Sequence, residues 1–375
     1  MTTVRVRDVC DMMDAWAPPA WAESWDRVGL QIGRPDQPVS GVGVCLSVTE
    51  ETARRAQGQE INLIVAHHPV IWTPFRALRM DEPQARLCVE LAADGMAVFA
   101  AHTNLDVAPG GVNAQLALRI GLEKTEPLFP AAGALQVKLV TFVPESHLEA
   151  VRGAVCDAGA GVIGDYTHCS FSAPGTGTFL PGDNASPWSG AHGRVNEEPE
   201  RRFEVLVPKA RLGRAVAALL SVHPYEEPAY DVFPLDNTIP GVGLGRVGSL
   251  PAPEEARVFA ERVRRALVAP GARAVLPDPE APVRRVAVLG GSGGGETGRI
   301  PADVDAYVTG DMRYHDALTA RERLLTVVDA GHHATETPVL PEIARRIAKA
   351  FPALSVAVLP EQDPFADEAE AAAQV

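Results

Sequence analysis

The sequence lacks the features that mark several common classes of protein. Its five cysteines form no C-x-x-C pair and are odd in number, so a disulfide framework is not expected; they are Cys10, Cys45, Cys88, Cys156 and Cys169. The amino end has no apolar signal core, and no apolar run is long enough to span a bilayer. We therefore expect a reduced, cytoplasmic protein with no membrane partner.

Basic residues are also scarce. The chain has 34 Lys and Arg against 48 Asp and Glu, a formal net charge of −14. Because phosphate-backbone binding needs a basic face, this balance argues against nucleic acid as a partner, whereas a small anionic ligand stays compatible if cations are bound locally. The length of 375 residues and the hydrophobic fraction of 46% predict two or three domains with a sizeable core.

The first part of the chain alternates short apolar runs with helix-like segments. Val42–Ser47, Ile61–Ala66 and Met96–Ala101 are predicted strands, and Thr49–Gln57 and Pro83–Asp94 have the pattern of helices. Strands that alternate with helices indicate an α/β layer with parallel pairing.

The middle of the chain has a different pattern. After Pro130 we expect strands at Gln136–Pro144, Arg201–Val207 and Ala229–Leu235 and helices at Ser146–Gly159 and Lys209–Leu220. A loop-rich stretch dense in Gly, Pro, Ser and Asn, Ala173–Asn196, lies between the first helix and the second strand. We interpret this region as the β-α-β-β-α-β unit of an inserted ferredoxin-like domain.

The first pattern returns after Thr238. Helices are predicted at Glu254–Leu267 and Pro341–Ala350, and strands at Val286–Leu289, Ala306–Thr309, Leu324–Asp329 and, as an edge strand, Leu354–Leu359. The predicted fold class is thus α/β: a discontinuous two-lobed core (residues 1–130 and 238–362) with an inserted α+β domain (131–237). The acidic tail, 363–375, is expected to be disordered.

Three predicted strands run directly into residues that bind metals. The residues concerned are His67 and His68, then His102 and Asp106, then His332 and Glu336. In open α/β sheets ligands gather at the carboxyl ends of strands, so we expect these side chains to meet in one crevice at a sheet edge. Imidazole together with carboxylate suits Zn, Fe or Mn.

The spacing of these residues indicates two ions. Adjacent His67 and His68 point in different directions, so each could hold one ion of a pair, whereas His332 and Glu336 lie at i and i+4 on one helical face. A carboxylate such as Asp106 could bridge ions that stand roughly 3.5–4 Å apart and activate a shared water. An isolated His-His pair is more often polar surface or a satisfied core pair. Three such clusters at three strand ends favour the metal interpretation.

Two further segments leave alternatives open. Asp311 and His315 also stand at i and i+4, either as a pair that orients ligands and moves protons, or as a helix N-cap with a solvated histidine. Val286–Gly298 is a predicted strand followed by glycines, of which Gly293, Gly295 and Gly298 satisfy G-x-G-x-x-G, but no helix is expected directly after it and no Gly-Lys-Ser/Thr occurs. We interpret the glycine stretch as a loop that lines the crevice, with Ser292 and backbone N–H groups available to a substrate.

Five segments carry a recognisable pattern across nearly the whole chain: SWDRVGLQIG (Ser24–Gly33), AHHP (Ala66–Pro69), HTNLD (His102–Asp106), TGDMRYHD (Thr309–Asp316) and GHHATE (Gly331–Glu336). In this order they resemble the dinuclear-metal, hexamer-forming family called GTP cyclohydrolase I type 2 homologues, or the Nif-three-like family. HPYEEPAYD resembles part of the PII- and CutA-like insert of its longer members. One departure is Ser47, where many relatives carry an aspartate.

The resemblance implies a set of site residues and an assembly. It implies metal ligands at His67, His68, Asp106, His332 and Glu336, with the two carboxylates as bridges and His332 preferred over His333. It also implies a toroidal homohexamer whose metal sites face an inner cavity.

Two functions are consistent with these features. The first is a metal-dependent hydrolase that acts on a nucleotide or related small molecule through a metal-bridging water, GTP cyclohydrolase-like or a phosphoesterase, with His315, His102 and Asp311 as candidate catalytic residues. The second is a non-catalytic hexamer that binds metal or nucleotide in a regulatory or metal-handling role.

Overall fold

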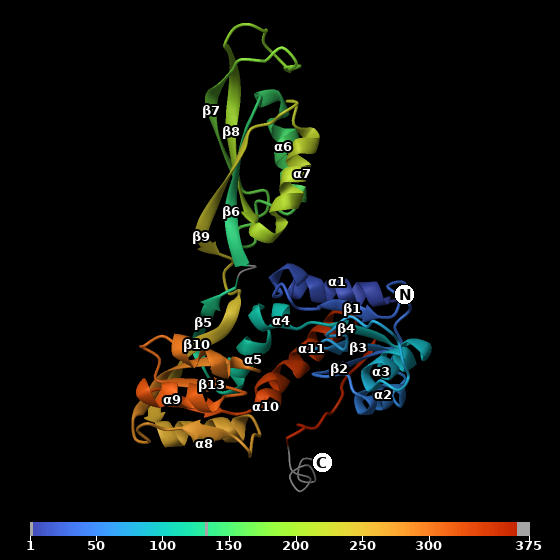
Figure 1. The fold of residues 1–375 in the computed structure, drawn as a ribbon, viewed down its shortest axis with the longest axis vertical. Helices are drawn as coiled ribbons and strands as arrows, with labels where there is room; N and C mark the ends of the chain where they lie inside the picture. The colour runs from blue at the N-terminus through green and yellow to red at the C-terminus, as the bar shows by residue number, and fades with distance from the viewer. Residues whose placement is uncertain (1–2, 132–133, 366–375) are drawn as a thin grey trace. The chain divides into compact units, whose positions relative to one another are not determined.

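The computed structural model describes residues 3–131 and 134–365. The predicted disordered tail lies, from residue 366 on, outside the described residues. The chain divides into two compact units, one formed by Met1–Ala131 with Gly241–Val375 and the other by Ala132–Pro240 (Figure 1). The first unit is therefore discontinuous in sequence, and the α/β fold class with an inserted domain is confirmed.

The first unit contains a five-stranded sheet with the order β1-β4-β3-β2-β15. Its strands are β1 (Gly29–Ile32), β2 (Gly41–Cys45), β3 (Leu63–Ala66), β4 (Ala97–Ala100) and β15 (Ser355–Val358). All neighbours pair in parallel except β1 with β4. Since β2, β3 and β4 are buried along their whole length, they account for the continuous apolar runs of the sequence.

Helices cover both faces of this sheet. Val65 and Phe99 point to the face packed by α1 (Val6–Trp16) and α11 (Leu340–Ala350). The alternate residues point to the opposite face, which α2 (Glu50–Gln57) and α3 (Pro83–Ala93) cover. The sheet is therefore held rigidly on two sides, which positions the loops at its carboxyl edge.

A second, six-stranded sheet in the same unit has the order β11-β14-β13-β12-β10-β5. Its strands are β5 (Glu123–Pro130), β10 (Gly243–Glu255), β11 (Arg273–Val275), β12 (Pro282–Leu289), β13 (Ala306–Thr309) and β14 (Thr326–Asp329). Only β12, β13 and β14 pair in parallel. The helices α5 (Val112–Arg119) and α8 (Ala256–Ala266) pack on one face, and α9 (Tyr314–Glu322) lies on the other.

The two sheets exchange strands between the predicted lobes. β5, from the amino-terminal part, joins the second sheet, and β15, from the carboxyl-terminal part, joins the first. A division of the core into sequence lobes therefore does not separate the sheets. Within the described residues, none of the helices has both the length and the apolar character to cross a membrane.

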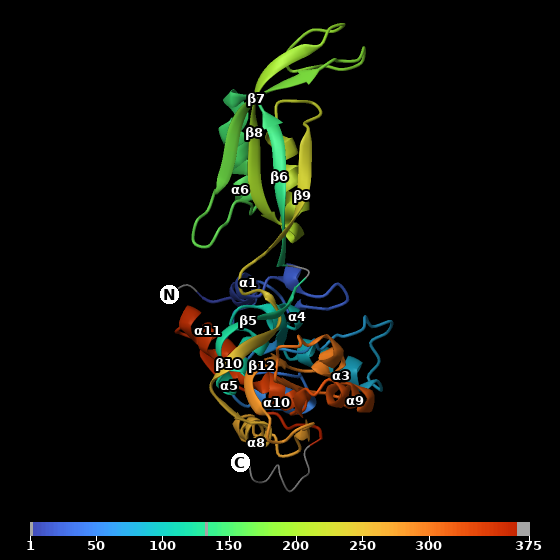
Figure 2. The ribbon, with the colours of Figure 1, turned by 90° about the vertical axis from the view of Figure 1, so that its left-hand side faces the viewer.

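The second unit is a four-stranded antiparallel sheet with the order β7-β8-β6-β9. Along the chain it runs β6 (Leu135–Val143), α6 (Leu148–Asp157), β7 (Ser170–Phe179), β8 (Asn196–Pro208), α7 (Leu212–Val222) and β9 (Tyr230–Thr238). Figure 2 shows the four strands side by side, and Figure 1 shows both helices against one face. This is the predicted β-α-β-β-α-β order.

One prediction for this unit is wrong in detail. The composition of Ala173–Asn196 predicts a loop-rich stretch, but its first residues belong to β7, which pairs with β8 from Ser170–Val205 to Phe179–Asn196. An edge strand needs a partner on one side only, so it tolerates Pro174 and two glycines that a central strand would not.

Asn113 links the elements that surround the carboxyl edges of the sheets. Its side chain is 1% exposed; Nδ2 donates to the carbonyl of Asp106 at 3.0 Å, and Oδ1 accepts from the N–H of Gly290 at 2.9 Å. We expect Asn113→Ala to lower the free energy of unfolding by about 1–3 kcal/mol, because buried backbone groups lose their partners. Urea denaturation measures this. Gln59→Ala, at an exposed position, is the control, and equal stability of the two variants would contradict the prediction.

Candidate metal centre

Three segments place their polar residues at one point in the first unit. His67 and His68 follow β3, whereas His102 and Asp106 lie at the start and within α4 (Thr103–Val107), which follows β4. The third segment is α10 (His332–Glu336), which follows β14. The sequence predicts a crevice at the edge of one sheet. Because β14 belongs to the second sheet, the crevice lies instead between the carboxyl ends of two sheets.

His67 is the best test of whether these residues fit a metal ion. Its side chain is 0% exposed, and its Nδ1 lies 2.8 Å from the carbonyl of Ala101, which assigns the ring proton to Nδ1. Nε2 is buried without a hydrogen-bond partner, 3.7 Å from Asp106 Oδ1 and 3.7 Å from Glu336 Oε1. These distances are too long for hydrogen bonds. They are close to the ~3.4 Å between two ligands of one tetrahedral ion with bonds of about 2.1 Å, so the residues fit.

The other oxygen of Glu336 faces a second pair of histidines. Glu336 Oε2 lies 2.9 Å from His68 Nε2 and 3.2 Å from His332 Nε2. The ligand atoms of these three residues all lie within 4.8 Å of one another, as do those of His67, His68 and His102. Glu336 therefore turns one oxygen toward each of two groups of possible ligands, which is the arrangement a bridging carboxylate requires.

Groups from different elements hold the imidazole rings in place. Ser47 Oγ lies 2.9 Å from His68 Nδ1, and Asp311 Oδ2 lies 2.8 Å from His332 Nδ1. Such contacts leave Nε2 free to face the centre. Ser47, the departure from the family pattern, therefore still contacts His68.

Asp26 is a site residue that the sequence analysis missed. Its Oδ1 lies 2.9 Å from His102 Nδ1, and Oδ2 accepts from the N–H of Thr103 at 3.0 Å. These contacts hold the pKa of Asp26 at about 2, although burial alone would raise it. The sequence indicated Asp26 only through its place in the SWDRVGLQIG segment. Asp26 and His102 are too far apart in the chain for a helical or strand spacing to pair them.

The ionisable groups of the centre shift one another strongly. Burial alone would lower the pKa of His67, but the carboxylates of Glu336 and Asp106 raise it to about 9. The hydrogen bond to Glu336 likewise raises the pKa of His332 to about 9. Burial raises the pKa of Asp106 to about 6, whereas the neighbouring imidazoles keep the pKa of buried Glu336 well below its usual value.

The remaining predicted residues take different positions. Asp311 contacts His332 and has φ +55°, but the N-cap of α9 is Arg313, so the alternative of a capping Asp311 is wrong. His315 is exposed on α9, where its ring packs edge-on against Tyr314.

The glycine-rich loop does reach the centre. Gly291 has φ +67°, and a Cβ there would overlap Glu336 Oε1. Contrary to expectation, the glycines themselves form a 3-10 helix, Gly293–Arg299. Ser292, proposed to face a substrate, lies exposed just before this helix.

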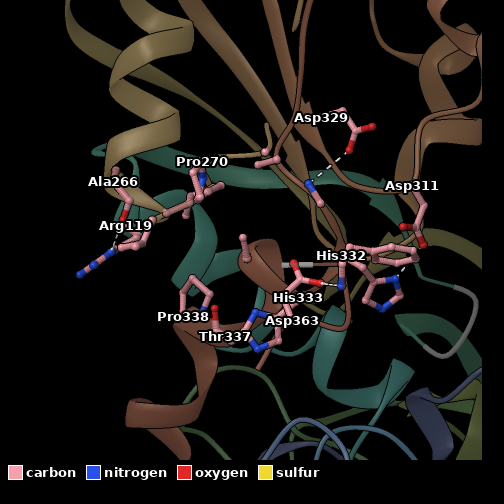
Figure 3. Close-up of a pocket in the computed structure, with 18 of the residues that line it drawn as sticks. Arg119, Ala266, Pro270, Asp311, Asp329, His332, His333, Thr337, Pro338 and Asp363 are labelled. Atoms are coloured by element: carbon pink, nitrogen blue, oxygen red, sulfur yellow. Dashed lines mark hydrogen bonds and ion pairs between the residues drawn. The ribbon is translucent and has the colours of Figure 1, made fainter. Parts of the chain in front are cut away.

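An open cleft of about 1320 Å³ adjoins the centre. Asp311 and His332 lie on one side of it and Arg119 on the other, with His333 between them (Figure 3). His332 both contacts Glu336 in the centre and lines this cleft. The cleft therefore adjoins the centre at His332.

Known proteins resemble the chain along its length. The model of the Duf34/NIF3 (NGG1p interacting factor 3) family matches residues 4–364. The GTP cyclohydrolase 1 type 2 homolog of Mycobacterium tuberculosis is 42% identical over 354 residues, 93% of each chain. That of Bacillus subtilis is 41% identical over 335 residues, which cover 88% of this chain and 89% of the relative.

Solved structures agree with this likeness. The Bacillus cereus protein related to NIF3 has a TM-score of 0.77 and 38% identity, with 98% of this chain and 100% of that chain covered. Staphylococcus aureus protein SA1388 has a TM-score of 0.79 and 26% identity, with 98% and 99% covered.

The pKa values of the centre predict how stability depends on pH when a chelator keeps metal away. The pKa of His67 is about 9 in the folded chain and 6.5 as the ordinary value, so the folded state binds the proton more tightly. The stabilisation that the protonated His67 contributes is therefore complete below pH 6.5 and is lost by pH 9. From His67 alone the loss is on the order of 3 kcal/mol, and the more exposed His332 adds to it. Denaturant titrations between these pH values measure it.

Matched variants separate this effect from other titrations. His67→Gln should reduce the dependence between pH 6.5 and 9 to the part that His332 contributes, because the glutamine side chain does not titrate. His315→Gln, on the exposed face of α9, should leave it unchanged. A wild-type protein of constant stability over this range would show that the centre does not hold the extra protons.

Proposed function

The chain belongs to the Duf34/NIF3 family, and we propose that it is a metal-dependent hydrolase that holds two divalent ions and acts on a nucleotide or related small molecule. The observation that carries the proposal is Glu336, whose two oxygens face different imidazoles in a buried pocket. A carboxylate in this position needs positive charge on both sides.

The residues divide into two groups around this carboxylate. His67 and Asp106 would hold one ion with Glu336 Oε1, and His68 and His332 would hold the second with Oε2. This donor set suits Zn, Fe or Mn. When bound, a pair of such ions lowers the pKa of water and polarises the bond to be cleaved.

The chain's own residues supply orientation and proton transfer. Asp26 holds His102 by Nδ1, which leaves Nε2 to accept or return a proton beside His67 and His68. Asp311 orients His332 in the same way. The proton-moving role predicted for His315 is not included, because its side chain lies exposed on α9.

Two reactions suit this centre. The names of the relatives suggest GTP, with opening of the guanine ring at C8 and release of formate. Hydrolysis of a phosphoester suits paired ions with carboxylate bridges equally well. Arg273 in the adjoining cleft is paired with Asp329, whereas Arg119, which lines the same cleft, supports an anionic substrate.

A non-catalytic sensor is the second candidate function. The second unit has its own cavity of about 690 Å³, lined by Trp188 and Tyr225 among others, which is large enough for a small molecule. In this role the protein would bind metal or a nucleotide without consuming it.

Metal content and turnover together test the proposal. Protein purified without added metal should contain about two ions per chain, as measured by elemental analysis and by anomalous scattering at the metal edges. Glu336→Gln should lose both ions, and Asp106→Ala at least one, whereas His315→Gln should retain both. Wild-type metal content in Glu336→Gln would refute the shared site.

The loaded protein should then release formate or phosphate from GTP, and Asp106→Ala should lower that rate at least 100-fold, since the centre no longer forms. If GTP raises the melting temperature but is not consumed, the sensor function replaces the hydrolase. If Asp106→Ala behaves as wild type on every substrate tried, the enzyme proposal fails.

We also propose that the chain assembles as a toroidal homohexamer, as the family resemblance implies. Sedimentation equilibrium should then give a mass of about 240 kDa, six copies of the 39.8 kDa chain. A monomer or dimer at micromolar concentration would exclude this assembly.

A further inference from the structure

We propose that Trp25 and Trp72 form a stacking site for the planar nitrogen heterocycle of the substrate. This inference rests on the proposed function, because it names the substrate class that the same centre would accept. It goes beyond that function in assigning a recognition role to two side chains that contribute no ligand to a metal.

The two indoles form a continuous aromatic surface that reaches the centre. Their ring centroids are 5.6 Å apart with an interplanar angle of 49°. Both pack edge-on against the imidazole of His102, at 6.1 Å for Trp25 and 5.4 Å for Trp72. The same imidazole lies 5.2 Å from the ring of His67 and 5.6 Å from that of His68. A ring bound on this surface would thus lie beside the proposed ions.

Both tryptophans leave a large part of their surface free. Trp25 is 53% exposed and Trp72 50%. Exposed aromatic surface next to a buried polar centre is a frequent property of ligand sites and is costly to leave in water. The two indoles already contact each other, so a ligand ring would pack on their exposed faces and not between them.

The surface is preorganised by one side chain. The amide of Gln31 connects the two loops: Oε1 accepts from the N–H of Ile71 at 3.0 Å, and Nε2 donates to the carbonyl of Arg27 at 2.9 Å. Each of these backbone groups is within two residues of a tryptophan. The loops are therefore fixed relative to one another, which reduces the entropic cost of binding a rigid ring.

Each loop is also anchored on its own. Asp26, directly after Trp25, is held by Thr103 and His102. Gln84 donates to the carbonyl of Val70, two residues before Trp72, at 2.6 Å. Planar heterocycles gain most from such a fixed surface, because every base presents a π-face and stacking does not depend on its hydrogen-bond pattern. A purine or pyrimidine nucleotide, whose base would stack on the indoles beside the centre, has this chemistry.

Calorimetric titration of metal-loaded protein tests the inference. The probes are GTP, ATP and UTP, and tripolyphosphate serves as the anion without a base. Trp25→Leu and Trp72→Leu should each bind at least one of these nucleotides about tenfold more weakly than wild type, while tripolyphosphate affinity and metal content stay unchanged. Trp72→Phe should keep most of the affinity, because it keeps a π-face. Tyr166→Leu, in the second unit and 75% exposed, is the control and should bind as wild type.

The outcomes separate this inference from the proposed function. Nucleotide affinity that is unchanged in both leucine variants overturns the stacking site, even if GTP is hydrolysed. So does wild-type protein that binds tripolyphosphate as tightly as every nucleotide. A changed sedimentation mass with unchanged nucleotide affinity would assign the tryptophans to an interface between copies. If the tryptophans govern binding but no product forms, the stacking site stands and the hydrolase proposal alone fails.

Discussion

The buried carboxylate of Glu336 is the constraint on which the centre depends. It is 4% exposed and lies within 3.7 Å of His67, His68 and His332. A carboxylate removed from water is costly unless positive charge and hydrogen bonds replace its hydration. Here that charge comes either from imidazolium groups, which explains the high pKa of His67, or from bound cations. The same pocket can therefore hold protons or metal, and the two compete for it.

The fold serves this carboxylate by bringing two sheets together at their carboxyl ends. The loops after β3 and β4 come from one sheet, and α10 follows a strand of the other. Because the strands are buried, the loops start from rigid positions. Each imidazole is then oriented by a group from another element, such as Ala101, Ser47 or Asp311. Preorganisation of this kind keeps ligand atoms facing one point before any ion is bound.

The first unit stays rigid although the second unit interrupts its sequence. The reason is that the strand before the insert pairs with the strand after it. β5 precedes the second unit and β10 follows it, and the two are antiparallel neighbours in the second sheet. The β-α-β-β-α-β unit therefore leaves the core at one edge and returns to it there. Its own hydrophobic core, built around Phe203 and Leu139, is separate from those of the first unit.

Much of this protein could be predicted from its sequence, for local physical reasons. Apolar runs identified the buried strands, helical periodicity identified α2, α3 and α11, and metal-type residues after three strands indicated the centre. Each of these signals lies within a few neighbouring residues, where the backbone period decides which side chains share a face. The resemblance added the family and the choice of His332 over His333.

Only the tertiary structure decided which distant groups meet. It placed the centre between two sheets, joined Asp26 to His102 and set Trp25 against Trp72. It also placed His315 at an exposed position on α9, against Tyr314. Strand β7 formed from a Gly- and Pro-containing stretch because β8 was available to pair with it. Contacts between residues far apart in the chain depend on packing, strand order and backbone direction, and no local pattern encodes these.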